Sequence, residues 1–436
     1  MTLLAGAARV SIGPRPDDLR EGVWLGGFGA YRERRATAVH DEPQCRAIAI
    51  SDGTTAFVLA ALDLVGASGP LLSSIRDDAA RLTGLPPGHI LLACTHSHAS
   101  PDTQGLWGGI GDSYRTHIAH RAGSAIWEAH HALASASASA ATTHLAGVTK
   151  NRRAWPETDD TLTSVRFTSL EGAPISTLVN FAAHPTATGS ANTEVSRDWC
   201  GYAVDAVERE AGGVAIYVNG AIGDVNPLDA GSFDAAERLG EAVARASIAS
   251  LQTPDPVNGA VYVRSDALEV PLNFERLSQR VQSAIDRSGF AIAALAKAGG
   301  LRATQLALHT AGRRDLAQLV AALEGMSERP KTHRDGQAFL RTHCGYVSIG
   351  DRVEAFATPG EVLTRLAAPL RASMGAPHRM FFGLTHDTLG YFLPEDEWMM
   401  PGRNNNYEES VSMGRRAGPA LADALLAMVP HRREAR

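Results

Sequence analysis

Short apolar runs that alternate with helix-like segments are the feature that most constrains the fold of this chain. The runs AFVLAALDLV, HILLAC, TLVNFAAHP and VAIYVNG have the length and continuity typical of buried strands. Helical spacing appears between them in GPLLSSIRDDAARLTGL, where Pro70 suits a first turn, and in WCGYAVDAVERE. This alternation predicts an α/β fold with a layered mixed β-sheet core flanked by helices.

The middle of the chain has a different pattern. Residues 272–330 hold two Ala- and Leu-rich stretches with helical spacing, which predict a helical insertion or cap. Beyond them HCGYVSIG, VEAFAT and RMFFGL are predicted strands, while PGEVLTRLAAPLRAS and SVSMGRRAGPALADALLAMV are predicted helices. Because no low-complexity linker divides the chain, we expect residues 1–436 to form a single domain.

Composition narrows the class of protein. The chain has 436 residues, of which 44% are hydrophobic and 20% charged, as in soluble globular proteins with an ample core. A net charge of −6 gives no reason to expect nucleic acid or a membrane surface as partner. No segment has the roughly 18 uninterrupted apolar residues that a membrane helix requires, so we expect no stable membrane insertion. The sequence is compatible with a homo-oligomer.

The cysteines and the N-terminus bear on the compartment. Cys45, Cys94, Cys200 and Cys344 form no CxxC pair, which argues against a cysteine-based zinc site and agrees with a reducing environment. The segment MTLLAGAARVSIGP lacks the basic region of a signal peptide. We therefore expect a cytoplasmic protein.

Polar residues gather where the predicted strands end. Asp63, His96, His98 and His184 all follow apolar runs, and strand ends are where α/β proteins build sites. On an extended strand His96 and His98 would point to the same side, and imidazole is a common zinc ligand. A polar strand cap is the alternative interpretation. The pattern also leaves open a second metal near Asp63, Asp102 or His98.

Two further segments carry candidate site residues with ordinary alternatives. In GAIGDVNP, Gly220 and Gly223 would let backbone amides approach an anion, or Asp224 would simply bond its own backbone in a plain turn. Glu361 is expected at a helix start, where the helix dipole alone would explain it. Arg152 suits either a clamp on a carbonyl or carboxylate, or a solvated basic run.

The order of these motifs resembles that of the neutral/alkaline (non-lysosomal) ceramidase family. The motifs are THSHASPDT, NRRA, NFAAHPT, GAIGDVNP, PGE and GY followed by YEES. The resemblance runs from GAARVSIGP to the final predicted helix, and the middle helical region is its poorest match. The chain is too short for the immunoglobulin-like domain of the classical members, so it resembles their catalytic domain alone, as in a shorter bacterial branch.

The resemblance implies a site with one catalytic Zn²⁺. By motif position the metal ligands would be His96, His184, Glu361 and, more weakly, Tyr391. His98 would lie beside the metal and handle a proton or stabilise the transition state. The substrate's polar groups would be bound by Arg152 and Tyr407, with Gly223 and Asp224 as further candidates in the nearby turn.

One position departs from the family pattern. The family places a nucleophilic serine after the GDV turn, and this chain has Asn226 there. An amide cannot replace that hydroxyl, so we expect Asn226 to orient the carbonyl or a water molecule.

These residues predict a zinc-dependent hydrolase. It would cleave the C–N amide bond of a small or N-acylated substrate through metal-activated water. One alternative is an ester or lactone hydrolase, or an acyl-transfer or amide-forming biosynthetic enzyme that uses the same site. Another is a non-catalytic binding protein with a degenerate site.

Overall fold

The computed structural model describes residues 2–28, 34–272, 331–335, 337–399 and 407–430. The predicted helical insertion at 272–330 therefore lies almost wholly outside the described residues. The four cysteines are all described, and each is buried and free of disulfide bonds.

The larger of two main sheets has nine strands and forms the centre of the fold. Its strand order is β13–β11–β10–β8–β1–β5–β6–β7, and β15 pairs with β8. The strands are β1 (Leu3–Ser11), β5 (Gln44–Ser51), β6 (Ala56–Leu62), β7 (Ile90–Cys94), β8 (Ala134–His144), β10 (Thr161–Ser169), β11 (Pro174–Phe181), β13 (Val214–Asn219) and β15 (Asp255–Val257). The β6–β7 and β11–β13 pairs are parallel and the β1–β5 and β10–β11 pairs antiparallel, so the predicted mixed sheet is confirmed.

The second main sheet has five strands. Its order is β16–β18–β19–β21, with β17 also paired to β18. These strands are β16 (Val261–Pro271), β17 (Lys331–Arg334), β18 (Gln337–Ile349), β19 (Val353–Ala357) and β21 (His378–Phe382).

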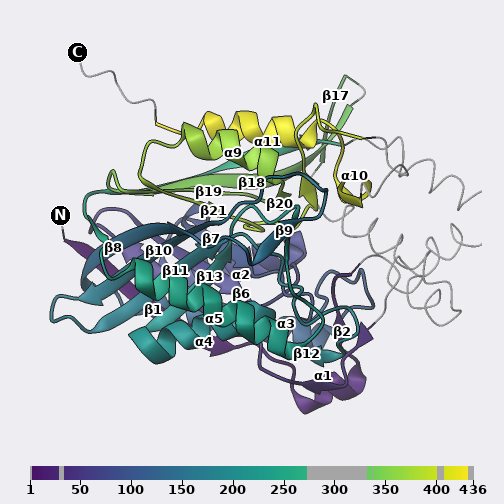
Figure 1. Ribbon diagram of the computed structural model, residues 1–436, viewed down its shortest axis with the longest axis horizontal. Coiled ribbons are helices and arrows are strands. Elements are labelled where there is room, and N and C mark those ends of the chain that lie inside the picture. Colours follow the sequence, from purple (N-terminus) through teal and green to yellow (C-terminus); the bar gives the residue numbers. More distant parts are fainter. Residues whose placement is uncertain (1, 29–33, 273–330, 336, 400–406, 431–436) are drawn as a thin grey trace, which may run out of the picture.

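The two sheets and their helices form four layers (Figure 1). Helices α2 (Gly69–Thr83), α3 (Asp112–His131), α4 (Asp198–Ala211) and α5 (Phe233–Ser250) cover one face of the larger sheet. The second sheet packs on its other face, and α9 (Thr364–Ser373) and α11 (Ala417–Leu426) cover the outer side of that sheet. The predicted layered α/β class is thus confirmed.

Strand periodicity explains how one sheet serves two layers. Along β5, Ala47 and Ala49 face α2 and α3, whereas Ile48 and Ile50 face the second sheet. Small residues on the helical face allow close approach, and large ones fill the space between the sheets.

Helix α2 shows the end signals expected from its sequence. Ser68 caps α2 by accepting a hydrogen bond from the Leu71 amide, and Gly84 ends it in the left-handed conformation. The strand β8 was not predicted, because its alternating Ser and Ala side chains lack the bulk that marks a buried strand.

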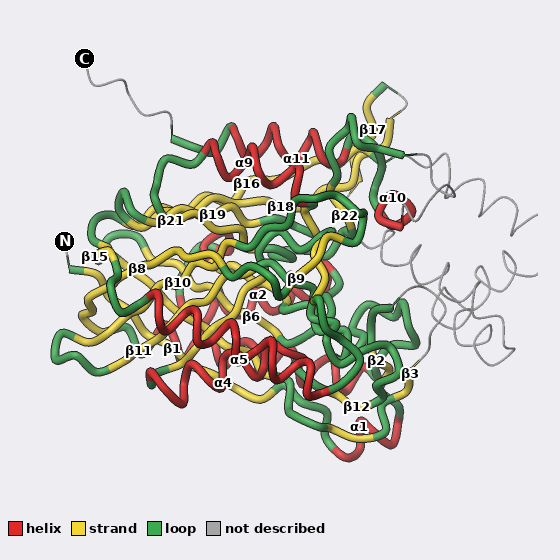
Figure 2. Tube along the Cα trace, viewed as in Figure 1, coloured by secondary structure: helices red, strands yellow, loops and turns green. Residues whose placement is uncertain are grey.

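Short elements and loops gather at one end of the sheets (Figure 2). They are α1 (Pro16–Glu21), β2 (Trp24–Leu25), β3 (Arg34–Arg35), β4 (Ala38–Val39), β9 (Thr149–Asn151), β12 (Glu194–Val195), β14 (Val225–Pro227), β20 (Glu361–Val362), β22 (Tyr391–Phe392) and α10 (Tyr407–Val411), whereas the 3₁₀ turn Pro87–His89 leads into the start of β7. The segments that follow β7, β11, β13 and β19 carry the predicted site residues, and the ends of β7 and β13 meet through Asn219.

Candidate metal centre

His96 is positioned by a sharp turn after β7. The strand ends at Cys94, and the His96 backbone has φ of 68°, a left-handed conformation uncommon for this residue type. The His96 amide donates to the Leu64 carbonyl at 2.9 Å, and Nδ1 of the ring donates to the Val65 carbonyl. The expectation that His96 and His98 share the face of an extended strand is therefore wrong, since this turn brings the two rings together.

Asn219 joins the end of β13 to this turn. Its buried amide nitrogen donates to the carbonyls of Cys94 and Thr95, both at 2.9 Å. Its oxygen accepts a hydrogen bond from the Tyr217 hydroxyl at 2.9 Å. The two strands at opposite ends of the sheet order thus meet directly beside His96.

His184 enters the same space from the end of β11. It is fully buried, its amide donates to the Val225 carbonyl at 2.8 Å, and its own carbonyl accepts from the Trp199 indole at 3.3 Å. The loop that follows is held by the buried carboxylate of Asp198, which accepts from the amides of Ala187 and Thr188.

Glu361 lies in the short strand β20, which pairs in parallel with β22 and sets Glu361 opposite Tyr391. The expected helix start at Glu361 is wrong, because α9 begins at Thr364 with Leu363 as its cap residue. The helix dipole therefore does not account for this buried carboxylate.

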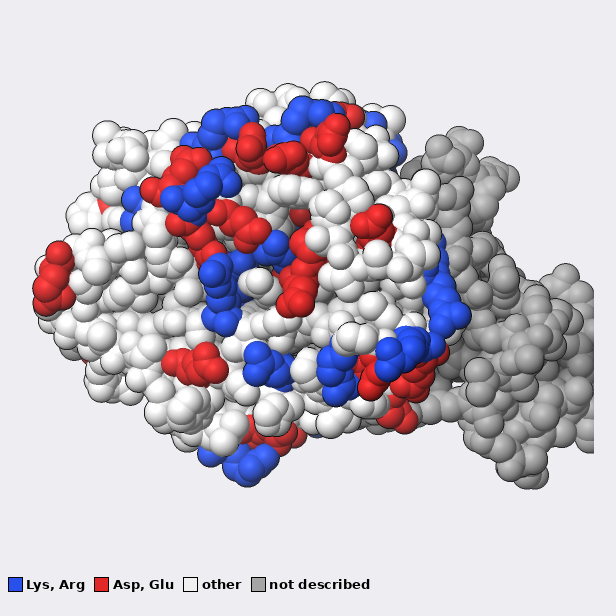
Figure 3. Space-filling view, turned by 90° about the horizontal axis from the view of Figure 1, so that it is seen from below, with Lys and Arg blue, Asp and Glu red and all other residues white. Residues whose placement is uncertain are grey.

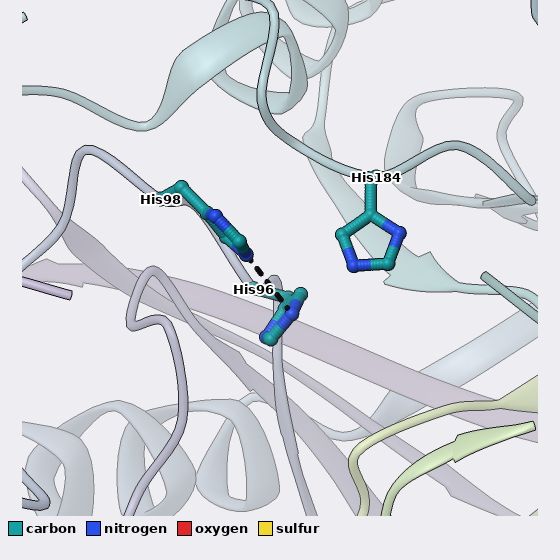
Figure 4. Close-up of side chains that lie close together, drawn as sticks. All are labelled: His96, His98 and His184. Atoms are coloured by element: carbon teal, nitrogen blue, oxygen red, sulfur yellow. Dashed lines mark hydrogen bonds between the residues drawn. The ribbon is translucent and has the colours of Figure 1, made fainter. Parts of the chain in front are cut away.

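The turn after β7, the loop after β11 and the strand β20 bring three histidines and one carboxylate together. The ligand nitrogens of His96, His98 and His184 all lie within 4.8 Å of one another, and this group could hold a metal ion. In Figure 4 the rings of His96 and His98 lie next to each other and the ring of His184 faces them. The Glu361 carboxylate completes the group, with oxygens 3.6 Å from Nε2 of His96 and 2.9 Å from Nε2 of His184.

The polar atoms of this group are those expected of metal ligands. Nε2 of His184 and Oε2 of Glu361 are buried, and neither has a hydrogen-bond partner among the described residues. Although they are 2.9 Å apart, they lack the alignment of a hydrogen bond. Two imidazoles and one carboxylate form a donor set that suits a catalytic zinc site, so these residues fit such an ion.

The electrostatic environment favours the protonation states that bind metal. Burial lowers the pKa of His184 to about 4. Burial alone would raise the pKa of Glu361, but the imidazoles of His96 and His184 lower it well below its usual value. A neutral imidazole and an ionised carboxylate are the forms that coordinate a cation.

His98 differs from the other two histidines in its hydrogen bonds. Its Nδ1 accepts from the Phe28 amide at 3.2 Å, and its Nε2 lies 3.2 Å from Nε2 of His96. Burial lowers the pKa of His98 well below its usual value, and the neighbouring His96 and His184 add to this effect. We therefore describe His98 as a neutral ring at the edge of the group.

Arg152, Tyr391 and Tyr407 form one wall beside the group. The Arg152 guanidinium donates to Glu408 and to the Gly223 carbonyl, both at 2.6 Å, and lies 5.1 Å from the centre of the Tyr391 ring. Tyr407 packs edge-on against Tyr391 with ring centres 5.9 Å apart. These three residues lie together, and their substrate roles remain predictions.

The turn after β13 is fastened by internal hydrogen bonds. The amides of Gly220 and Gly223 donate to the carbonyls of Phe181 and Val362, both at 2.9 Å. Asp224 accepts from the Thr364 amide and hydroxyl, both at 2.8 Å, and from Asn151 at 2.7 Å. These bonds give Gly223 and Asp224 structural roles, and their binding of substrate stays a prediction.

Asn226 lies in β14, where it pairs with Lys150 of β9. Its side-chain oxygen is buried and has no hydrogen-bond partner among the described residues. The side-chain oxygen of Asn226 is therefore available as a hydrogen-bond acceptor. Asn226 also lies next to Val225, whose carbonyl accepts from the His184 amide.

The acidic residues considered for a second metal have other partners. Asp102 accepts hydrogen bonds from the amides of four residues in its own loop, Gln104, Gly105, Trp107 and Gly109. Asp63 accepts from the Gln44 amide and the Thr95 hydroxyl. These bonds account for both carboxylates structurally.

Sequence reasoning missed several residues that build the site. Phe28 acts through its backbone amide, which donates to His98, and Asn219 acts through its buried side chain, which donates to the turn after β7. No sequence motif identifies either residue. Arg153 holds α10 through ion pairs to Glu408 and Glu409, both at 2.8 Å. The acidic pair in YEES beside the basic pair in NRRA is the one signal that would have suggested this clamp.

The described surface adds two observations about partners. On the face in Figure 3, basic and acidic side chains are interspersed among uncharged ones. Within the described ranges, no helix combines the length and apolar character required to cross a membrane.

Comparison with known proteins identifies the fold. No family model matches the chain, and no curated protein matches it either. Among solved structures, the neutral ceramidase from Pseudomonas aeruginosa is similar with a TM-score of 0.73 and 17% identity over 98% of this chain and 74% of that one. A ceramidase complexed with C2 gives a TM-score of 0.71 and 16% identity over 98% of this chain and 75% of the other.

At this identity the comparisons establish the fold. The chain has an α/β fold with a buried histidine cluster that could hold a metal. That fold is the one seen in neutral ceramidase structures, as the motif order indicated. The organisation of residues 1–436 as a single domain stays a prediction.

Proposed function

We propose that this protein is a zinc-dependent hydrolase that cleaves the C–N amide bond of a small or N-acylated substrate. The observation that carries the proposal is the buried group of His96, His184 and Glu361, in which Nε2 of His184 and Oε2 of Glu361 face each other without a hydrogen-bond partner among the described residues. The fold shared with neutral ceramidases supports amide chemistry as the first activity to test.

His96, His184 and Glu361 would hold the ion, and Tyr391 is a fourth candidate ligand because it lies opposite Glu361. When bound, zinc polarises a carbonyl and lowers the pKa of a coordinated water to about 7. Burial around His184 and Glu361 would exclude bulk water and strengthen each electrostatic interaction at the reacting carbonyl.

The remaining residues would bind and orient the substrate. Arg152 and Tyr407 would contact polar groups of the substrate from the wall they share with Tyr391. Asn226 would accept a hydrogen bond from the amide N–H or from water through its free oxygen. His98 would either handle the proton that leaves with the amine or stabilise the oxyanion formed at the carbonyl.

Metal analysis of the purified protein is the first test. We expect one tightly bound zinc per chain, and substitution of His96 or His184 by Ala should remove zinc and activity together. His378→Ala is the matched control, since His378 is also buried but lies at the start of β21. Full activity in metal-free His96→Ala protein would contradict the proposal.

Product analysis distinguishes the other activities considered. N-acylated amines, esters and lactones should be offered with and without an amine acceptor, and the products identified by mass spectrometry. Release of free acid and amine from the amides supports the proposal. Cleavage of esters or lactones alone, or acyl transfer to the amine, would contradict it, as would binding of the amides without turnover.

A further inference from the structure

The chain segment at Gly26, Gly27 and Phe28 lies directly against the histidine cluster. A Cβ atom on Gly27 would lie 2.3 Å from Cγ and Nδ1 of the His98 ring, so no side chain fits there without displacing that ring. A Cβ atom on Gly26 would lie 2.3 Å from the side chain of Val65. The backbone carbonyl of Val65 accepts the hydrogen bond from the His96 ring. The segment therefore contacts the His98 ring itself and Val65, the residue that holds the His96 ring.

The Phe28 amide determines which nitrogen of His98 carries the proton. A backbone amide can only donate, so Nδ1 of His98 must accept in this 3.2 Å hydrogen bond. The proton of the neutral ring then resides on Nε2. The Phe28 ring packs edge-on against His98 with ring centres 4.9 Å apart, which holds the imidazole in this orientation.

The hydrogen bonds continue from Phe28 through His98 and His96 to Val65, each group donating to the next. Nε2 of His98 lies 3.2 Å from Nε2 of His96, and His96 uses its Nδ1 to donate to the Val65 carbonyl. Nε2 of His96, the atom that a metal would coordinate, therefore carries a lone pair, and in this structure it accepts from the Nε2–H of His98.

We propose that the Gly27–Phe28 turn is the positioning element that holds His98 as the neutral Nε2–H tautomer. In this form His98 is a hydrogen-bond donor beside the metal, and neither a ligand nor a base. The tautomer follows from the hydrogen bonds alone, while its catalytic use rests on the proposed function and selects oxyanion stabilisation as the role of His98.

Nitrogen NMR of histidine-labelled protein, as purified with its metal, tests the tautomer directly. The His98 signals are assigned by their loss in His98→Ala. We expect a protonated Nε2 and an unprotonated Nδ1, whose chemical shifts are well separated. A protonated Nδ1 would overturn the proposal.

Kinetics of Gly27→Ala test the positioning role. Gly53→Ala is the matched control, because Gly53 has φ of 89° against 86° for Gly27, but a Cβ atom on Gly53 would have no other atom within 4 Å. We expect Gly27→Ala to retain zinc while kcat falls about 100-fold, the scale of a misplaced reacting group. The Gly53→Ala protein should retain wild-type kcat.

A double-mutant cycle shows whether the turn acts through His98. In a His98→Ala background, Gly27→Ala should cause no further loss of kcat. A further loss, an equal effect of Gly53→Ala, or loss of zinc in step with activity in Gly27→Ala would overturn the proposal. The Phe28→Gly variant keeps the amide donor, and its His98 should retain the Nε2–H tautomer.

The two proposals fail in distinguishable ways. If the wild-type protein bound no zinc and hydrolysed no amide, the proposed function would fail, while the nitrogen shifts of His98 would still test the turn. If zinc and hydrolysis were found but His98 carried its proton on Nδ1, the turn proposal alone would fail.

Discussion

At the residue scale, the site depends on hydrogen bonds that assign a different role to each histidine. His96 donates through Nδ1 to a carbonyl, His98 accepts at Nδ1 from an amide, and His184 has both ring nitrogens without partners among the described residues. The residue type is the same in each case, and the partner decides which nitrogen remains available.

Glu361→Gln tests the charge of the proposed ligand with little change in shape. We expect zinc affinity to fall by more than the roughly 10- to 100-fold typical of an outer-shell partner, because the anionic oxygen itself is lost. Affinity is measured by competition with a chelator. Glu157→Gln, which alters an exposed carboxylate paired with Arg365, should leave the affinity unchanged. Equal affinities in the two variants would remove Glu361 from the ligand set.

Asp63 should make stability depend on pH. Burial raises its pKa to about 6 from 3.8, so the folded state binds a proton more tightly than the unfolded state. The contribution of Asp63 to the unfolding free energy should therefore decrease, by an amount on the order of 2 kcal/mol, as pH rises from about 4 to about 6.5. In Asp63→Asn this contribution should be absent, so the difference between the two proteins isolates it.

Urea unfolding of both proteins across this pH range measures the effect. The stability of Asp63→Asn relative to wild type should rise with pH, whatever constant offset its altered hydrogen bonds produce. A difference that does not vary with pH would show that Asp63 has an ordinary pKa.

At the element scale, the site forms because strands distant in sequence end side by side. β13 and β7 lie at opposite ends of the strand order, yet Asn219 links the end of one to the turn after the other. β20 and β22 then bring Glu361 and Tyr391 into the same space. Each of these strands, or the turn that follows it, contributes one or two residues. The site therefore requires all of these strands to be in place.

Asn219→Ala should weaken both stability and zinc binding. It leaves two buried carbonyls, those of Cys94 and Thr95, without their donor, and we expect a loss of about 2–3 kcal/mol of unfolding free energy. Because the turn that presents His96 is loosened, zinc affinity should fall as well.

Asn180→Ala provides the matched comparison. Asn180 is also buried and donates to two carbonyls, those of Val218 and Phe381, at 2.8 and 2.7 Å. It should lose similar stability in urea unfolding and retain zinc affinity. Equal zinc affinities in the two variants would contradict the role assigned to Asn219.

At the scale of the whole molecule, the layer between the two sheets unites the fold. Large side chains from both sheets fill it around an apolar void of about 10 Å³, lined by residues that include Leu59, Val347 and Met380. Since the larger sheet supplies His96 and His184, and Glu361 follows the end of β19 in the second, the site depends on how the sheets are docked.

Leu59→Ala tests this docking. Truncation of a fully buried leucine should cost about 2–5 kcal/mol, because it enlarges an existing void between rigid sheets. Leu82→Ala, at a leucine that is 50% exposed on α2, should cost less than about 1 kcal/mol. Urea unfolding should stay a single transition, and two separate transitions in Leu59→Ala would show that the sheets unfold independently.

Much of the fold and part of the site could be predicted from local patterns. Continuous apolar runs marked β6, β7, β11 and β13, because side chains buried on both faces leave an unbroken hydrophobic signal. The α/β class followed from their alternation with helices, and His96, His98 and His184 were recognisable as strand-end residues. β8 escaped because its small side chains carry no such signal.

The amino-acid sequence by itself determined the layered class and the residue types near the proposed metal, because both depend on short-range patterns along the chain. Only the tertiary structure decided how those residues meet. The turn at His96, the strand at Glu361 and the tautomer of His98 depend on contacts with Asn219, Tyr391 and Phe28, which come from other parts of the chain. Hydrogen bonds to backbone amides and carbonyls set these features, and no side-chain pattern records which distant group will be the partner.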